Sequence, residues 1–158
     1  KSLMYQESSS VPYIFYVPGV TDGTVAETQM VSHVDIMPTL LDLVGVDSPS
    51  HAQGRSVAPV IRGEADVLPN NHVFIESEIQ AVGVRTPRYT LAKRFDRTTR
   101  ETTRDKMRLY DTKADPFEMT NLAAVDPDHS AIAEWEGILD DWHERTPWMV
   151  IDQHVETH

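Results

Sequence analysis

The sequence predicts a mixed α/β fold, which as an isolated chain is an α+β arrangement. A continuous run of apolar, aromatic and β-branched residues at 11–17 predicts a strand buried on both faces. From residue 72 onward apolar and polar residues alternate, which predicts a small antiparallel sheet with one solvated face. Two segments with apolar residues at helical spacing, one before and one after this sheet, predict helices.

The first of these helices is predicted within residues 32–45. Met37, Leu40, Leu41 and Val44 recur at helical spacing, and Gly45 stands where a left-handed residue ends a helix. Pro38 is tolerated only in the first turn of a helix, so we expect Asp35 to be the N-terminal cap.

The loop over residues 46–71, rich in Pro, Ser and Gly, is the predicted boundary between two parts of the chain, residues 1–71 and residues 72–158. Strands are predicted at 72–79, 81–84, 88–95 and 107–111. A final helix is predicted at about 128–145. Its apolar stripe, which we expect to pack on the sheet, is made of Ile132, Trp135, Leu139 and Trp142.

The composition excludes some chemistry within this chain. None of the 158 residues is a cysteine, which excludes a disulfide framework, a cysteine-ligated metal and a thiol nucleophile. The net charge is −11, but residues 85–113 carry ten basic and four acidic side chains. We interpret this basic segment as a hairpin neutralised by acidic neighbours. The alternative, a nucleic-acid patch, is opposed by the overall negative charge.

No complete catalytic set is visible in the residues. The chain lacks a G-x-S-x-G elbow, a G-x-G-x-x-G or Walker loop, and the H-x-H or H-E-x-x-H spacing of a zinc site. We therefore predict no catalytic residue and no metal ligand in this chain, and we expect neither nucleic acid nor a membrane as a partner.

Several segments nevertheless resemble, in order, motifs of the sulfatases of the alkaline phosphatase superfamily. Residues 1–19 are similar to a family stretch that starts with a lysine and leads into a Val-Pro strand. The remaining matches are Asp35-Ile-Met-Pro-Thr39, Gly54-Arg-Ser56, Val84-Arg-Thr86 with Tyr89, Leu109-Tyr-Asp111, Asp115-Pro-Phe-Glu118 and Asn121-Leu122.

The resemblance implies that the chain is the C-terminal portion of a sulfatase, inactive alone. Residues 1–71 then end the catalytic α/β domain, and residues 72–158 form a small C-terminal subdomain. In the family a formylglycine made within C/S-x-P-x-R attacks sulfur, and a divalent cation, usually calcium, is held near an Asp-His-Gly motif. Neither motif occurs here, so the nucleophile and the cation are expected in an N-terminal half of the same protein.

One site residue carries over from the family. Lys1 aligns with the lysine that contacts the sulfate group, a role suited to a compact charge with three donors. The implied substrate of the complete enzyme is a sulfate-ester small molecule or a sulfated glycan. Two alternatives stay open: a phosphonate monoester hydrolase or phosphodiesterase of the same superfamily, and a non-catalytic acidic binding domain.

Overall fold

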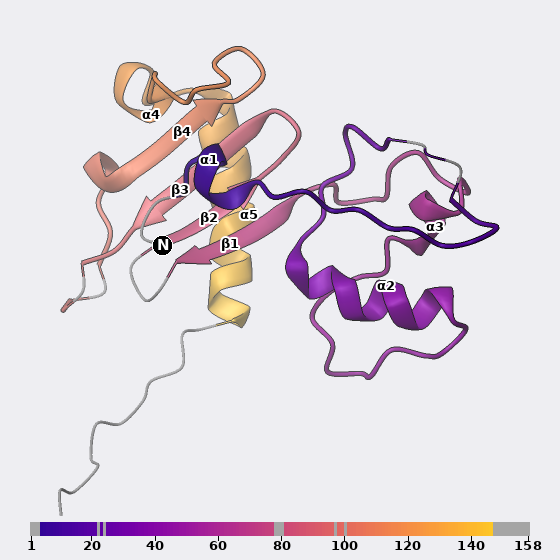
Figure 1. The fold of residues 1–158 in the computed structure, drawn as a ribbon. Coiled ribbons are helices and arrows are strands. Elements are labelled where there is room, and N and C mark those ends of the chain that lie inside the picture. The colour runs from indigo at the N-terminus through magenta and orange to yellow at the C-terminus, as the bar shows by residue number, and fades with distance from the viewer. Residues whose placement is uncertain are drawn as a thin grey trace, which may run out of the picture.

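The computed structural model describes residues 4–21, 23, 25–77, 81–96, 98–99 and 101–146. It contains a short helix α1 (Gln6–Ser9), a helical pair, α2 (Ile36–Leu43) and α3 (Ala58–Ile61), and a sheet covered by a long helix (Figure 1). The predicted mixed fold is confirmed, because the described chain combines helices with an antiparallel sheet.

The sheet has four antiparallel strands in the order β1 (Val73–Ser77), β2 (Ala81–Arg85), β3 (Tyr89–Arg94) and β4 (Met107–Asp111). Consecutive strands are neighbours, and the register places Val84 opposite Leu91 and Leu91 opposite Leu109. All four predicted strands are present. The first is described as far as Ser77, and the last two residues predicted for it, 78 and 79, lie outside the described residues.

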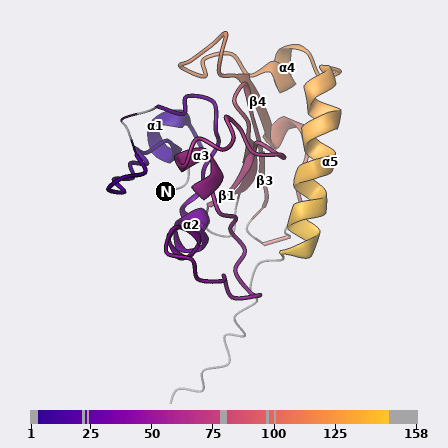
Figure 2. The same ribbon diagram turned by 90° about the vertical axis from the view of Figure 1, so that its right-hand side faces the viewer.

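Helix α5 (Ser130–Arg145) covers one face of this sheet, as Figure 2 shows. Val82, Val84, Leu91 and Leu109 on that face are fully buried against the predicted apolar stripe of the helix. The helix begins two residues later than predicted because His129 caps it. The Nδ1 atom of His129 accepts the amide hydrogen of Ala131 at 3.2 Å.

The second face of the sheet is not solvated, so that prediction is wrong. The N-terminal segment lies on it: Met4 packs against Ala81, Ala92 and Ile75, and α1 follows on the same side (Figure 2). The small side chains make this approach possible. A Cβ atom on Gly83 would lie 2.8 Å from the Met4 sulfur.

The strand predicted at residues 11–17 is also absent. The described sheet uses only residues from 73 onward, so this segment has no neighbouring strand with which to form a ladder. Ile14 is 87% exposed and Tyr16 is 84% exposed, whereas both were expected to be buried.

Helix α2 begins directly after Asp35, as predicted, with Pro38 in its first turn. The carboxylate of Asp35 does not cap α2. It accepts the amide hydrogens of Ser32 at 2.8 Å and Arg55 at 2.9 Å, and so ties the preceding turn, η1 (His33–Asp35), to the loop before α3. At the other end Gly45 has φ +74°, and the amide of Val46 donates to Leu41, which is a Schellman ending.

Of the predicted apolar stripe of α2, Leu41 is half-buried, and the other members are exposed. Pro38 and Thr39 are the buried residues of the helix, while Met37, Leu40 and Val44 are 45%, 49% and 72% exposed. Nor is any helix among the described residues long and apolar enough to span a bilayer.

Candidate functional site

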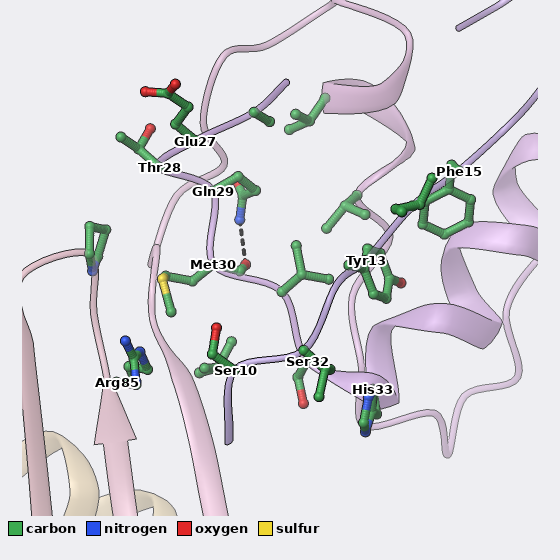
Figure 3. A pocket seen from close by; sticks show the side chains of 18 of the residues that line it. Ser10, Tyr13, Phe15, Glu27, Thr28, Gln29, Met30, Ser32, His33 and Arg85 are labelled. Atoms are coloured by element: carbon green, nitrogen blue, oxygen red, sulfur yellow. Dashed lines mark hydrogen bonds between the residues drawn. The ribbon is translucent and has the colours of Figure 1, made fainter. Parts of the chain in front are cut away.

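A large cavity lies between the sheet, the N-terminal segment and the helical pair. Its volume is about 1460 Å³, and it is lined by residues from four places in the chain (Figure 3). Residues 8–16 and 25–33 form much of the wall, α3 adds Val60 and Ile61, and the edge of the sheet adds β1 and the end of β2. The sequence alone gave no signal for this cavity, because its walls are distant in the chain.

One wall of the cavity is fixed by amide side chains. The Oδ1 atom of Asn71 accepts the amide hydrogen of Met30 at 2.7 Å, and Gln29 Oε1 accepts that of Leu68 at 2.7 Å. These bonds join residues 28–30 to the segment that leads into β1. The chain at this wall is therefore held by side-chain contacts without any regular element.

The opposite wall contains aromatic side chains. Tyr13 and Phe15 are in edge contact, with ring centroids 4.9 Å apart, and Figure 3 shows both near α2. Burial raises the pKa of the Tyr13 hydroxyl. This wall is thus largely apolar and suits the body of a ligand rather than its charge.

Arg85, at the end of β2, brings a positive charge to the cavity (Figure 3). Its Nη2 atom donates to Gln6 Oε1 at 2.8 Å. Burial lowers the pKa of Arg85, and nearby Glu118 and Glu7 act in the opposite direction. The guanidinium therefore lies between the sheet, α1 and two acidic side chains.

The remaining basic segment is partly neutralised within the fold. Arg88 binds Asp111 through Nε and Nη2, at 3.0 and 2.9 Å from the same carboxylate oxygen. Lys93 is buried and contacts Glu136 and Asp140 of α5. Both pairs agree with the interpretation of a hairpin neutralised by acidic neighbours.

Lys1, the predicted sulfate-binding residue, lies outside the described residues, so its role stays a prediction. The implied divalent cation finds no site in the described part of the chain, where no three His, Cys, Asp or Glu side chains come together. The described residues therefore do not fit a metal centre.

The matched motifs around α2 have a structural explanation. Thr39 Oγ1 donates to Asp35 O at 2.6 Å and accepts the amide hydrogen of Val57 at 3.0 Å. A Cβ atom on Gly54 would lie 2.0 Å from Val34 O, so only glycine fits there. The Asp-x-x-Pro-Thr and Gly-Arg-Ser segments are therefore joined to each other in the fold.

Comparison with protein families gives a match along most of the chain. Residues 1–140 match the family described as N-sulphoglucosamine sulphohydrolase, C-terminal. The chain belongs to this sulfatase family. The resemblance expected from the motifs is thereby confirmed.

Individual relatives agree with the assignment. The chain is 36% identical over 152 residues to the Delta 4,5-hexuronate-2-O-sulfatase of Bacteroides thetaiotaomicron, covering 90% of this chain and 30% of that protein. A solved structure from a study of the metabolism of multiple glycosaminoglycans by the same bacterium is 26% identical, with a TM-score of 0.65. That match covers 83% of this chain and 30% of the solved chain.

A third similar structure is a phosphonate monoester hydrolase from Silicibacter pomeroyi. It is 26% identical with a TM-score of 0.52, and the match covers 70% of this chain and 24% of that one. In each of these three comparisons this sulfatase chain spans less than a third of the other protein's length.

The sequence of the sulfatase chain marks Arg85 only as the first residue of the basic segment 85–113, and it does not single out Glu118 as a functional residue. Both residues lie in matched motifs, Arg85 in Val84-Arg-Thr86 and Glu118 in Asp115-Pro-Phe-Glu118. The structure brings them to the same short helix, α1, from positions 33 residues apart. Their motif membership was the available signal, but pairing them with Gln6 requires the fold.

Proposed function

We propose that this chain is the C-terminal part of a sulfuric-ester hydrolase. Residues 1–71 then complete the α/β catalytic domain, and residues 72–158 form a small C-terminal subdomain. The observation that carries the proposal is the family match, which spans residues 1–140 and so includes α2 and the whole sheet. The match to a 2-O-sulfatase over 90% of the chain supports the same reaction class.

We propose a sulfated glycan containing uronic acid as the substrate class. The support is the activity for which the similar Bacteroides sulfatase, a Delta 4,5-hexuronate-2-O-sulfatase, is named.

The nucleophile and the cation belong, in this proposal, to an N-terminal half of the same protein. A formylglycine and a divalent cation, with calcium expected, would supply the attacking oxygen and the charge stabilisation in the complete enzyme. This chain would supply Lys1, whose ammonium binds a sulfate oxygen as a compact donor of three hydrogen bonds. The chain alone is expected to be inactive.

The exposed apolar residues support packing against that N-terminal half. Met37, Leu40 and Val44 form one side of α2, and Ile14 and Tyr16 project from the segment beside it. Exposed apolar surface of this kind marks an interface with another part of a protein. We assign it to the remainder of the catalytic domain.

The competing activity is phosphonate monoester hydrolysis. It is favoured by one observation, the structural similarity to the Silicibacter enzyme. Sulfate monoesters carry one negative charge, as phosphonate monoesters do, so the charge of the substrate does not separate the two. The relative rates of hydrolysis of an aryl sulfate and a matched aryl phosphonate ester distinguish the two activities.

The experiment compares p-nitrophenyl sulfate with p-nitrophenyl phenylphosphonate in the full-length protein and in its Lys1→Ala and Lys1→Arg variants. We expect the higher kcat/KM on the sulfate ester and a loss of about 10²–10³-fold in Lys1→Ala, as for other single charge-stabilising donors. Faster phosphonate cleavage would support the competing activity. Full activity of Lys1→Ala would refute the role of Lys1.

A further inference from the structure

Glu118 combines three features that are unusual for a surface-turn glutamate. It is only 4% exposed, although its neighbours Phe117 and Met119 are 74% and 82% exposed. Its φ is +52°, a conformation that non-glycine residues adopt at a cost and that concentrates at functional positions. The turn thus buries the Glu118 carboxylate and leaves the apolar side chains of Phe117 and Met119 exposed.

The inward carboxylate binds the start of the chain. Glu118 Oε2 accepts the amide hydrogen of Gln6, the first residue of α1, at 2.8 Å across 112 positions of sequence. That amide belongs to the first turn of a helix and has no partner within the helix. A charged acceptor makes this one of the stronger kinds of hydrogen bond.

Arg85 binds the same residue from the other side. Its Nη2 atom donates to Gln6 Oε1 at 2.8 Å, so the sheet holds both the main chain and the side chain of Gln6. Arg85 Nη1 and Glu118 Oε1 are buried and have no hydrogen-bond partner in the described part of the chain. Each of the two side chains therefore uses one polar atom to bind Gln6 and keeps a second buried polar atom that makes no hydrogen bond among the described residues.

The two residues before Gln6 are fixed as well. Met4 is 8% exposed against Ala81 and Ala92, and the Tyr5 ring lies 5.9 Å from the Tyr110 ring. Lys1 is three residues before Met4, and three residues span at most about 11 Å. The anchoring of Met4, Tyr5 and Gln6 therefore limits the volume that the Lys1 side chain can reach.

We propose that Glu118 and Arg85 are positioning residues for sulfate-ester hydrolysis. By fixing Gln6 against the sheet they set the location of the segment that carries Lys1 in the catalytic cleft. The C-terminal subdomain thereby contributes to the rate without touching the substrate through these two residues. This inference rests on the proposed function of Lys1.

The test is a double-mutant cycle in the full-length enzyme with p-nitrophenyl sulfate. Glu118→Ala is expected to lower kcat/KM by about 10–100-fold, the size of effect produced by a small misplacement of a catalytic group. In the Lys1→Ala background the same substitution is expected to change kcat/KM by less than about twofold, because coupled residues are not additive. Glu118→Gln keeps an acceptor and is expected to restore most of the activity.

Asn121→Ala is the matched control. Asn121 lies three residues after Glu118 and binds Leu109 N and Met107 O of β4 without contacting α1. Its effect on kcat/KM, whatever its size, is expected to be the same with and without Lys1. If Glu118→Ala does not fold, as judged by thermal unfolding, Arg85→Met replaces it in the cycle.

The outcomes separate the two proposals. Equal losses from Glu118→Ala with and without Lys1 would overturn the positioning role while leaving Lys1 as a sulfate ligand. A Lys1→Ala enzyme with full activity would instead overturn the proposed function. Strong coupling of Glu118, together with none for Asn121, supports the inference.

Discussion

Lys93 Nζ lies 2.6 Å from Asp140 Oδ1, and this contact joins the C-terminal end of β3 to helix α5. The same ammonium lies 2.8 Å from Glu136 Oε1. The lysine side chain is only 6% exposed, whereas the side chains of Glu136 and Asp140 are 27% and 50% exposed. The positive partner is thus buried while the negative partners keep contact with water.

This asymmetry predicts unequal effects of removing either side. Lys93→Met fills the same space and leaves carboxylates that water can solvate, so we expect a change within about 1 kcal/mol in the free energy of unfolding. The double substitution Glu136→Ala with Asp140→Ala leaves a buried charge without compensation and is expected to cost about 2–4 kcal/mol. Urea unfolding measures both.

Asp141→Asn is the control for this prediction. Asp141 pairs with Arg145 on the exposed side of α5, where both side chains are about two-thirds exposed. Its removal is expected to change stability by less than about 0.5 kcal/mol. If Lys93→Met and the double substitution lower the free energy of unfolding equally, the burial of Lys93 does not determine the energy of this contact.

Gly83 is predicted to be essential for the approach of Met4 to the sheet. A Cβ atom there would lie 2.8 Å from Met4 Sδ and 3.0 Å from Leu91 O, and the second atom is backbone. Gly83→Ala is therefore expected to destabilise by about 1–3 kcal/mol, the usual cost of overpacking. Gly137→Ala, in the exposed middle of α5 with no atom near its added Cβ, is expected to stabilise by about 0.5–1 kcal/mol. Thermal unfolding that ranks the two variants in reverse order would contradict the packing described here.

The partly buried His72 is expected to make the stability of the protein depend on pH. Its ring contacts Phe74 and Trp135, and burial lowers its pKa below the ordinary 6.5, with Arg55 adding to the effect. A lowered pKa means that the unfolded chain binds the proton more readily. Stability is therefore complete above about pH 6.5 and decreases as the pH falls from there toward the folded-state pKa.

We expect His72→Phe to make the loss of stability between about pH 7 and about pH 5 shallower than in the unmodified protein. His51→Gln, at an exposed histidine, is the control and is expected to keep the original slope. Chemical unfolding at a series of pH values provides the measurement. If the free energy of unfolding changes with pH in the same way in all three proteins, His72 is not the source of the pH dependence.

A charge on the exposed side of α2 is also expected to lower the free energy of unfolding of the full-length protein. Leu40→Glu places a charge where we assign contact with the N-terminal half, and in the full-length protein it is expected to cost about 2–4 kcal/mol. Val125→Glu, on the 66% exposed Val125 of α4 (Leu122–Val125), is the control and is expected to be nearly neutral. A neutral Leu40→Glu would argue against the proposed interface.

The sequence predicted the parts of the fold that depend on local patterns. Alternation gave all four strands, and the spacing of Ile132, Leu139 and Trp142 gave the helix on the sheet. Gly45 and Asp35 marked the ends of α2 correctly, although the Asp35 carboxylate binds Arg55 N and not the helix. These features follow from residues close together in the chain.

Long-range features were not predictable in this way. Burial of residues 11–17 depends on neighbouring strands that the described chain does not contain, and the cover on the second sheet face comes from Met4 at the far end of the chain. The contact between Gln6 and Glu118 spans 112 positions and leaves no periodic pattern. The candidate site is built from such long-range contacts. The matched motifs contain Arg85 and Glu118 but do not indicate that both residues bind Gln6.

The most direct test of the account is sulfate release by the full-length protein compared with release by the 158-residue chain, measured on a 2-O-sulfated unsaturated hexuronate disaccharide. We predict release of inorganic sulfate by the full-length protein, abolished when the predicted formylglycine position is replaced by alanine, and none by the 158-residue chain. Sulfate release by the chain alone, or a full-length protein that binds sulfated glycans without hydrolysing them, would contradict the central claim.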